Sequence, residues 1–458
     1  MDNLLTVRPD DTGGPGGIID SVWLQSFDLE DGMHYTSFGK QKAQVAPRWA
    51  KEGVLYEVFV RDFSPTGDFK GLTAKLDELD ELGITILWLM PIHPIGEVNR
   101  KGTLGSPYSV QDYYGINADF GTGDDFRHLV EEVHARDMHI ILDMVPNHTA
   151  CDNALMTDHE DWYTHDSAGN IVSPNDDWSD VADLDYGNSE LRNYIQTMLA
   201  WWITEYNVDG FRIDVAEMMP GDFWLDTRTI LKATKADVFL LAEGSRPYLH
   251  VSGFDATYAF NSFRDFRAVA KGKDTPEAIH QAMRNERYGY PQGALRMRFL
   301  ENHDQLRAGD VLKQEERLLA ASIGAFLLPG LPMLYNGAEL GIAHRLELFD
   351  QDVIDWDSGS TYYRSQIAEI FKLRKQYPAL IEGDYQPHDY AGDVLIYGRN
   401  TEHESVVVAV NYGSTEVELK TSDNNLTPLD VLYHTEGAVF DKQSTRVTLP
   451  PYGGIVLR

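Results

Sequence analysis

Four acidic side chains stand at the carboxyl ends of separate apolar segments. Asp143, Asp214, Glu243 and Asp304 close runs such as HIILDMV and VFLLAEG, which have the length and composition of buried strands. A carboxylate in such a strand is costly to bury unless it is paired or takes part in chemistry. Any one of them is as readily a capping or ion-paired acid, but four at successive strand ends indicate a common site.

Arg212 and Asp214 lie two residues apart in GFRID, so in a strand their side chains point to the same face. We expect the guanidinium to keep Asp214 ionised, as a nucleophile requires, and Glu243, flanked by the apolar run LLA, to have a raised pKa and hold its proton. A retaining glycosidase uses such a pair of carboxyls, about 5 to 5.5 Å apart. Asp304 would then bind sugar hydroxyls.

These acids belong to a regular alternation of strands and helices. An amphipathic helix is expected over 70–82, and a second one is expected to be capped by Asp124 and Asp125. Eight strands in this alternation predict an α/β fold, a closed (β/α)8 TIM barrel whose carboxyl strand ends meet on one face. The eight strands are expected at 54–60, 85–90, 139–145, 208–215, 238–244, 254–260, 295–304 and 332–340.

Three stretches depart from the alternation. Residues 1–50 are mixed, with a short strand expected around 18–27, and are interpreted as an N-terminal extension. Residues 149–187 are polar and too long for an ordinary loop, which predicts a short excursion over the barrel mouth after the third strand. Residues 382–458 contain short alternating runs and predict a C-terminal antiparallel β-sandwich domain. The barrel is then expected to consist of 51–148 and 188–381.

The composition restricts the partners. The 458 residues include 39 Lys or Arg and 72 Asp or Glu, a net charge of −33, which disfavours nucleic acids and anionic membranes. So acidic a surface also suits high salt, a hypothesis that loss of activity in dilute buffer would support.

The single Cys151 excludes an intramolecular disulfide. No apolar run approaches the ~18 residues of a membrane span, and the first residues lack the plan of a signal peptide. The protein is expected to be cytoplasmic, or periplasmic or secreted after removal of a signal, and the sequence favours no particular oligomeric state.

The acid-bearing segments resemble the sequence regions of the α-amylase superfamily, glycoside hydrolase family 13. The resemblance covers roughly residues 50–458, with the motifs in the family's order. The matching segments are DMVPNH (143–148), GFRIDVAEM (210–218), LLAEG (240–244), ENHD (301–304), DLDY (183–186), GITILWLMPIHP (83–94), GLPMLYNGAE (330–339) and GSPYSVQDYYGIN (105–117).

The resemblance implies a retaining hydrolase of α-1,4-glucosidic bonds in starch, glycogen or maltooligosaccharides, without an organic cofactor. It implies Asp214 as nucleophile, Glu243 as general acid/base and Asp304 as the stabilising acid. Four further side chains would line the same glucosyl subsite, with a tyrosine ring stacking on the sugar and imidazoles donating hydrogen bonds. These are Tyr108, His148, Arg212 and His303. Without the motifs, Tyr108 would be read as a turn residue and the histidines as structural.

The chain departs from the family's calcium site. Many members carry Lys-His three and four places after the nucleophile, where this sequence has Glu217 and Met218. Oxygen ligands remain at Asn147, Asp183 and Asp185, so calcium is left open, and no metal is expected in the loop at 61–69.

Substrate size also stays open. Exo-acting relatives commonly carry Asp where this chain has Gly105, which favours an open cleft and endo action, whereas the short excursion also fits enzymes of small oligosaccharides. Trp162, Tyr163 and Trp178 are either glucan platforms or a small core of the excursion, while Trp201 and Trp202 are expected to pack in a helix.

Two alternatives remain. The first is transfer or isomerisation by the same chemistry, or α-glucosidase action, because a sugar can capture the glycosyl-enzyme in place of water. The second is a non-catalytic glucan-binding relative, which the intact set of Asp214, Glu243 and Asp304 disfavours.

Overall fold

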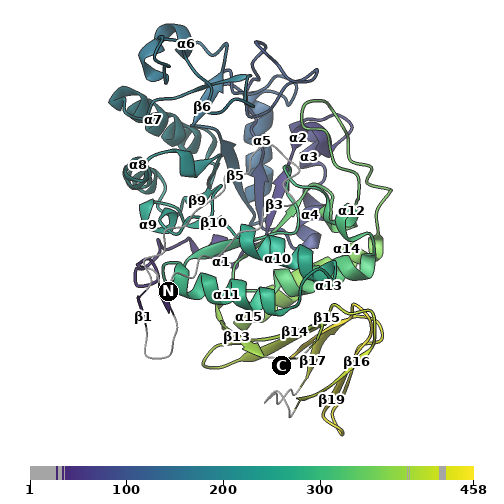
Figure 1. Ribbon diagram of the computed structural model, residues 1–458. Coiled ribbons are helices and arrows are strands. Elements are labelled where there is room, and N and C mark those ends of the chain that lie inside the picture. The colour runs from purple at the N-terminus through teal and green to yellow at the C-terminus, as the bar shows by residue number, and fades with distance from the viewer. Residues whose placement is uncertain (1–26, 29–33, 36, 389, 391, 422–429) are drawn as a thin grey trace.

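Eight parallel strands close into a barrel at the centre of the computed structural model (Figure 1). They follow one another around the barrel in chain order, and the last pairs back to the first through Met333 and Leu55. The strands are β3 (Leu55–Val58), β4 (Ile86–Leu89), β5 (His139–Met144), β8 (Gly210–Ile213), β9 (Phe239–Ala242), β10 (Ala256–Tyr258), β11 (Leu295–Arg298) and β12 (Leu331–Tyr335). The predicted TIM barrel is confirmed. The structure describes residues 27–28, 34–35, 37–388, 390, 392–421 and 430–458.

The strands are apolar on both faces because the barrel has two cores. One cluster fills its interior with side chains such as Ile86, Leu241 and Met297, while the alternate side chains of the same strands pack outward against the helices. All residues of the eight barrel strands are buried except His139, the first residue of β5. An acid at a strand end is therefore held by a rigid, buried frame.

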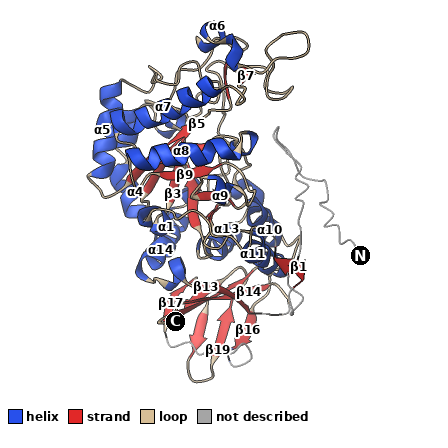
Figure 2. Cartoon of the chain, turned by 90° about the vertical axis from the view of Figure 1, so that its left-hand side faces the viewer, coloured by secondary structure: helices blue, strands red, loops and turns tan. Residues whose placement is uncertain are grey.

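Helices cover the outside of the barrel (Figure 2). They are α1 (Arg48–Glu52), α2 (Val60–Phe63), α3 (Phe69–Thr73), α4 (Leu76–Leu82), α5 (Gly123–His134), α7 (Ser189–Tyr206), α8 (Gly221–Thr234), α9 (Leu249–Ser252), α10 (Phe260–Ala270), α11 (Glu277–Gly289), α12 (Ala308–Leu312), α13 (Glu315–Phe326), α14 (Thr361–Gln376) and α15 (Ala379–Glu382).

Two helix predictions need correction. The helix expected over 70–82 is divided into α3 and α4, although the leucines of its apolar face are all buried. The cap of α5 is Thr122, whose hydroxyl accepts a hydrogen bond from Asp125 N–H, while the Asp125 carboxylate accepts one from Thr122 N–H. Asp125 therefore closes a capping box, and Asp124 lies in the first turn of the helix.

The excursion and the C-terminal sheets lie at opposite ends of the molecule, and the sheets pack against helices such as α13 (Figures 1 and 2). A two-stranded ribbon opens and closes the excursion, formed by β6 (His148–Ala150) and β7 (Val181–Asp183), with α6 (Leu155–Asp158) between them. The first strand of this ribbon begins four residues after β5 ends, so the excursion rises from the same barrel end as the four acids.

The C-terminal region consists of a five-stranded and a three-stranded antiparallel sheet, as predicted for an antiparallel β domain. An apolar cluster that includes Ile396, Ala409 and Leu449 joins the two sheets. The strands are β13 (Asp384–His388), β14 (Val394–Asn400), β15 (Ser405–Asn411), β16 (Val417–Lys420), β17 (Val431–His434), β18 (Val439–Asp441), β19 (Arg446–Leu449) and β20 (Gly454–Leu457).

Near the N-terminus, β1 (Phe27–Asp28) pairs with β2 (His34–Tyr35). Of the strand expected around 18–27, only Phe27 falls within the described residues. Among the residues that the structure describes, none of the helices combines the length and apolar composition that a membrane crossing requires.

Candidate active site

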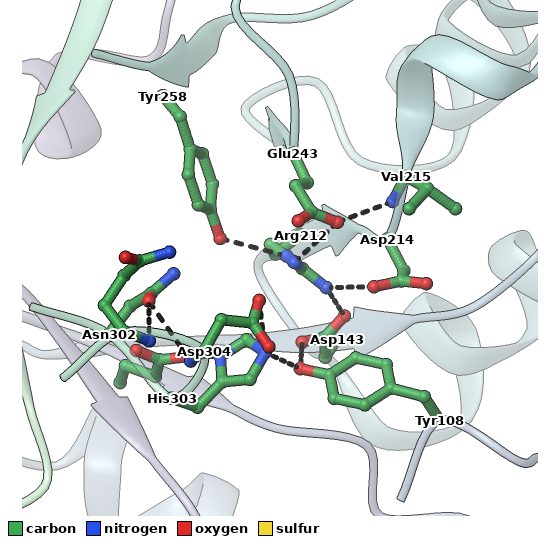
Figure 3. A network of polar contacts seen from close by, with 12 residues as sticks. Tyr108, Asp143, Arg212, Asp214, Val215, Glu243, Tyr258, Asn302, His303 and Asp304 are labelled. Carbon is green, nitrogen blue, oxygen red and sulfur yellow. Dashed lines mark hydrogen bonds and ion pairs between the residues drawn. The ribbon is translucent and has the colours of Figure 1, made fainter. Parts of the chain in front are cut away.

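The barrel brings the strand-end acids together around one arginine (Figure 3). Asp143 lies near the end of β5, Asp214 and Glu243 directly follow β8 and β9, and Asp304 lies in the segment after β11. Arg212 projects from β8 into the middle of this group, and its side chain is fully buried.

Arg212 is the common partner of three carboxylates. Its Nη1 lies 2.8 Å from Oδ1 of Asp143 and 2.8 Å from Oδ1 of Asp214, and its Nη2 lies 2.9 Å from Oε2 of Glu243. Its Nε donates a hydrogen bond of 3.1 Å to the hydroxyl of Tyr258. The nucleophile and acid/base candidates are thus oriented by the same guanidinium, which a neutral side chain could not replace without leaving buried charges unpaired.

The electrostatics differ from the expectation in one respect. Burial raises the pKa of Asp214 well above its usual range, and the charge of Arg212 opposes this rise. The side chain of Asp214 is only 10% exposed, whereas that of Glu243 is 19% exposed. Glu243 stands at the strand end, where its Oε2 accepts a hydrogen bond of 2.8 Å from Val215 N–H.

A second group of side chains surrounds His303. The Nε2 of His303 lies 2.9 Å from the hydroxyl of Tyr108, which donates a hydrogen bond of 3.1 Å to Asp143 Oδ2. Its Nδ1 lies 2.5 Å from Oε1 of Glu57 on β3. Burial lowers the pKa of His303, but the charges of Asp304 and Glu57 outweigh burial and raise it to about 9. At neutral pH His303 is therefore a cation that can donate hydrogen bonds.

The candidate sugar-binding residues differ in exposure. The side chain of Asp304 is 48% exposed and lies 3.3 Å from His303 Nε2, so its second oxygen is accessible to a ligand. The Tyr108 ring is stacked with the His303 ring at 5.2 Å between centroids. His148 is buried beside Asn147, and burial lowers its pKa to about 4, so it is a neutral donor and acceptor.

Sequence reasoning missed three residues of this site, Glu57, Trp88 and Tyr258. Glu57 anchors His303, and Trp88 Nε1 donates a hydrogen bond of 3.2 Å to Asp143 Oδ2. The signal for Glu57 was present in the strand VLYEVFV, where an acid stands among apolar residues as in the other strands. Trp88 and Tyr258 left no such signal, because an aromatic residue in a barrel strand is ordinarily core.

The tryptophans of the excursion divide into two kinds. Trp162 and Tyr163 are almost completely buried and form part of the large core cluster, which favours the packing interpretation. Trp178 is half-buried, and its ring lies 5.4 Å from that of His148. Trp201 and Trp202 pack in α7 as expected.

Glu217 bridges the loops that follow β8 and β9. Its Oε1 accepts hydrogen bonds from the backbone N–H groups of Ser245 and Arg246, the latter at 2.8 Å, and its Oε2 lies 3.3 Å from Arg246 Nε. Ser245 is two residues after Glu243. Glu217 therefore holds the backbone next to the acid/base candidate.

The calcium candidates line one hollow of about 420 Å³ at the base of the excursion. Asn147, Asp183, Asp185 and Met218 are among its lining residues, and so is Arg192. Burial raises the pKa of Asp183. Over the described ranges, no group of three or more His, Cys, Asp or Glu side chains has the geometry of a metal site. A metal here would therefore depend on the amide of Asn147 and on backbone carbonyls beside the two carboxylates.

The chain is similar in sequence to known proteins. The sequence model of the family described as "Alpha amylase, catalytic domain" matches residues 25–379. A relative named "Alpha-amylase MalA" from Haloarcula japonica is 29% identical over 393 residues, which cover 81% of this chain and 56% of the relative. The chain thus spans little more than half of that protein.

Two solved structures are similar along almost their whole length. An α-amylase from Lactobacillus plantarum has 32% sequence identity and a TM-score of 0.81, with 89% of this chain and 99% of that chain covered. A structure described as a noncanonic maltogenic α-amylase, AmyB from Thermotoga neapolitana, has 31% identity and a TM-score of 0.79, with 89% and 98% covered.

Proposed function

The chain belongs to the α-amylase family of glycoside hydrolases, and on that premise we propose that it hydrolyses α-1,4-glucosidic bonds of starch, glycogen or maltooligosaccharides with Asp214 as nucleophile and Glu243 as general acid/base. The observation that carries these roles is the sharing of one buried guanidinium by both carboxylates. A retaining mechanism needs one carboxyl as nucleophile and another as general acid/base at the same anomeric carbon. Arg212 holds both carboxylates in place.

In the first step an oxygen of Asp214 forms a bond to the anomeric carbon while the bond to the leaving oxygen breaks. Glu243 transfers its proton to that oxygen, and the shortened glucan departs. In the second step Glu243 takes a proton from water, the water oxygen attacks the same carbon, and the carboxylate of Asp214 leaves. The two inversions give net retention of configuration.

Charge explains how one of these carboxyls can hold the proton. Asp143, Asp214 and Glu243 surround a single cation, and burial raises the pKa of both Asp143, to about 6, and Asp214. Burial therefore favours the protonated form of these two aspartates. We propose that bound sugar excludes water from Glu243, the more exposed of the pair, and moves that proton to it.

The remaining residues bind the glucosyl ring. We propose that Tyr108 offers its ring to the sugar face, that Asp304 and cationic His303 bind hydroxyls, and that His148 does so from the excursion. Asp304 would also stabilise the positive charge that develops on the ring in the transition state.

The test is the product profile from soluble starch and from maltose to maltoheptaose, with Glu243→Gln as control. Early oligosaccharides from starch that are absent in the variant support hydrolysis by this site. Trehalose or rearranged sugars from maltose would instead move the assignment to a transferase or isomerase. Absence of any product would revive a glucan-binding role.

Calcium is a separate proposal. Asn147, Asp183 and Asp185, together with the backbone carbonyl of Met218, would hold the ion at the base of the excursion, since a carbonyl ligand does not depend on the side chain. Calcium there would fasten the excursion to the barrel and take no part in bond cleavage. Addition of calcium to chelator-treated protein should raise the thermal unfolding midpoint, and Asp183→Asn should abolish the shift. An unchanged midpoint in the native protein would contradict the site.

We also propose that the chain is divided into a catalytic barrel, an excursion and a C-terminal domain. Residues 51–148 and 188–381 would form the catalytic barrel, 149–187 the excursion and 382–458 the C-terminal β domain. The apolar cluster between the two C-terminal sheets supports the last unit.

A further inference from the structure

The order of strands divides the barrel mouth into two sides. Around the closed barrel, β9 stands opposite β3, and the neighbours of β3 are β4 and β12. Glu243 follows β9. The segments after β4 and β12 therefore lie on the side of the mouth farthest from Glu243. Figure 3 shows the same division, with Glu243 and Tyr108 on opposite sides of Arg212.

The segment 97–104, here called the strap, follows β4 and is fastened to the excursion. Lys101 Nζ lies 2.8 Å from Oδ1 of the buried Asp180 and donates a hydrogen bond of 3.1 Å to the carbonyl of Asp177. Asn99 donates one of 3.1 Å to the carbonyl of Ser179. One end of the strap is thus tied to the loop that carries Trp178.

The other end of the strap is fastened to the segment after β12. Leu104 N–H donates a hydrogen bond of 3.0 Å to the carbonyl of Phe349, and Thr103 N–H donates one of 2.9 Å to Asp350 Oδ1. A Cβ on Gly102 would lie 2.6 Å from Cβ of Phe349, so the two segments are in close contact. Lys101 Nζ also lies 6.0 Å above the Phe349 ring.

The strap and the segment after β12 are both connected to residues of the active site. Arg345 donates a hydrogen bond of 3.2 Å to the carbonyl of Asp304. Arg61 donates from Nη1 to the carbonyls of Gly105 and Leu348, both at 3.2 Å, and thereby ties the base of the strap to the segment after β12. Tyr108 follows three residues after Gly105. The strap therefore spans the mouth next to the residues proposed to bind the glucosyl ring.

We infer that the strap closes the glycone end of the site, so that the enzyme takes glucans by a free non-reducing end and releases short products. This inference rests on the proposed function. Glu243 protonates the leaving oxygen, which places the leaving part of the substrate on the β9 side. Sugars on the non-reducing side of the cleaved bond then extend toward the strap, where the joined loops limit how many fit.

The open cleft expected from Gly105 has a different explanation. Gly105 has φ 81°, and a Cβ there would lie 2.7 Å from Cγ2 of Ile95. A glycine is required by the backbone at the base of the strap, so the absence of an acid at this position carries no information about the width of the cleft.

The inference is tested with maltoheptaose whose non-reducing glucose is free or capped by a 4,6-ethylidene group, with initial rates followed by chromatography. The native enzyme should cleave the free form at least about tenfold faster, because the cap must enter the closed end. Lys101→Ala, which removes the tie to Asp180, should reduce this ratio. Gly102→Ala, which pushes the strap from Phe349, should do the same.

Lys75→Ala is the matched control. Lys75 pairs with Glu78 at 2.8 Å and lies 5.4 Å above the Trp356 ring, with a side chain 32% exposed against 30% for Lys101. Its loss should leave the ratio unchanged. Equal rates on both substrates in the native enzyme would overturn the inference, as would an unchanged ratio in both strap variants. Failure to cleave even the free form would instead contradict the proposed function itself.

Discussion

The two sides of the barrel mouth are held by different means. On the side of Glu243, the carboxylate of Glu217 accepts hydrogen bonds from two backbone N–H groups of the loop after β9. On the side of Tyr108, the strap joins the excursion to the segment after β12 by contacts along its length. Arg212 on β8 orients both reacting acids, and Glu217 also holds the backbone two residues after Glu243. We therefore expect bond cleavage to depend on the barrel strands and on the Glu217 side of the mouth, and the choice of substrate to depend on the strap side.

The largest effect should come from the acid on the β9 side. Glu243→Gln should lower the rate on maltooligosaccharides by about 10²- to 10⁴-fold, because the leaving oxygen loses its proton donor. The same variant should retain most of its first-step rate on α-maltosyl fluoride, since fluoride departs without protonation. Stopped-flow rates on both substrates check this.

Asp214→Asn is the control for that experiment. It should lose activity on the fluoride as well, because the attacking oxygen is required whatever the leaving group. Full loss on the fluoride in Glu243→Gln would contradict the assignment of the proton donor.

A smaller effect is expected at Glu217. Glu217→Ala should lower kcat by about tenfold and shift the basic limb of the pH–rate profile, because the backbone beside Glu243 loses its anchor. Glu217→Gln keeps an acceptor oxygen for the N–H groups of Ser245 and Arg246 and should recover most of the rate. Neither variant should change the preference for free over capped maltoheptaose, because we assign that preference to the strap on the Tyr108 side. A changed preference would contradict the assignment of bond cleavage and substrate choice to different sides of the mouth.

On the Tyr108 side, the ion pair of His303 makes stability depend on pH. The folded protein raises the pKa of this imidazole from 6.5 to about 9, so its contribution is fully present below pH 6.5 and is lost as pH rises through 9. The free energy of unfolding of the native protein should therefore exceed that of His303→Asn at pH 6 by more than at pH 10. Denaturant titrations at both pH values measure this, and a difference that grows with pH would be inconsistent with the pairing to Glu57.

The smallest effect is expected from salt. With a net charge of −33, self-repulsion of the surface should be reduced by added sodium chloride, which should raise the thermal unfolding midpoint. The buried contacts of Arg212 should be screened little, so the product profile should stay the same. A product profile that changes with salt would show that the surface charge affects substrate binding at the barrel mouth.

The sequence predicted the fold well because each barrel strand is an apolar run and each candidate acid stands at its end. The sequence could not predict contacts between residues that lie far apart in the chain. The contact between Glu57 and His303 joins residues 246 positions apart, and the tie between Thr103 and Asp350 spans 247. The raised pKa of Asp214 also required the structure, because burial at a strand end depends on neighbouring loops and not on the flanking residues.

Reaction of the native enzyme with a fluorinated maltosyl fluoride that is turned over slowly tests the proposed chemistry most directly. The fluoride leaves without an acid, while the electron-withdrawing fluorine slows hydrolysis of the ester, so the glycosyl-enzyme should accumulate. Peptide mapping by mass spectrometry should find one added fluorinated maltosyl group on the peptide that contains Asp214. A label on another carboxylate, or release of fluoride with no labelled peptide, would contradict the assignment of Asp214 as the nucleophile.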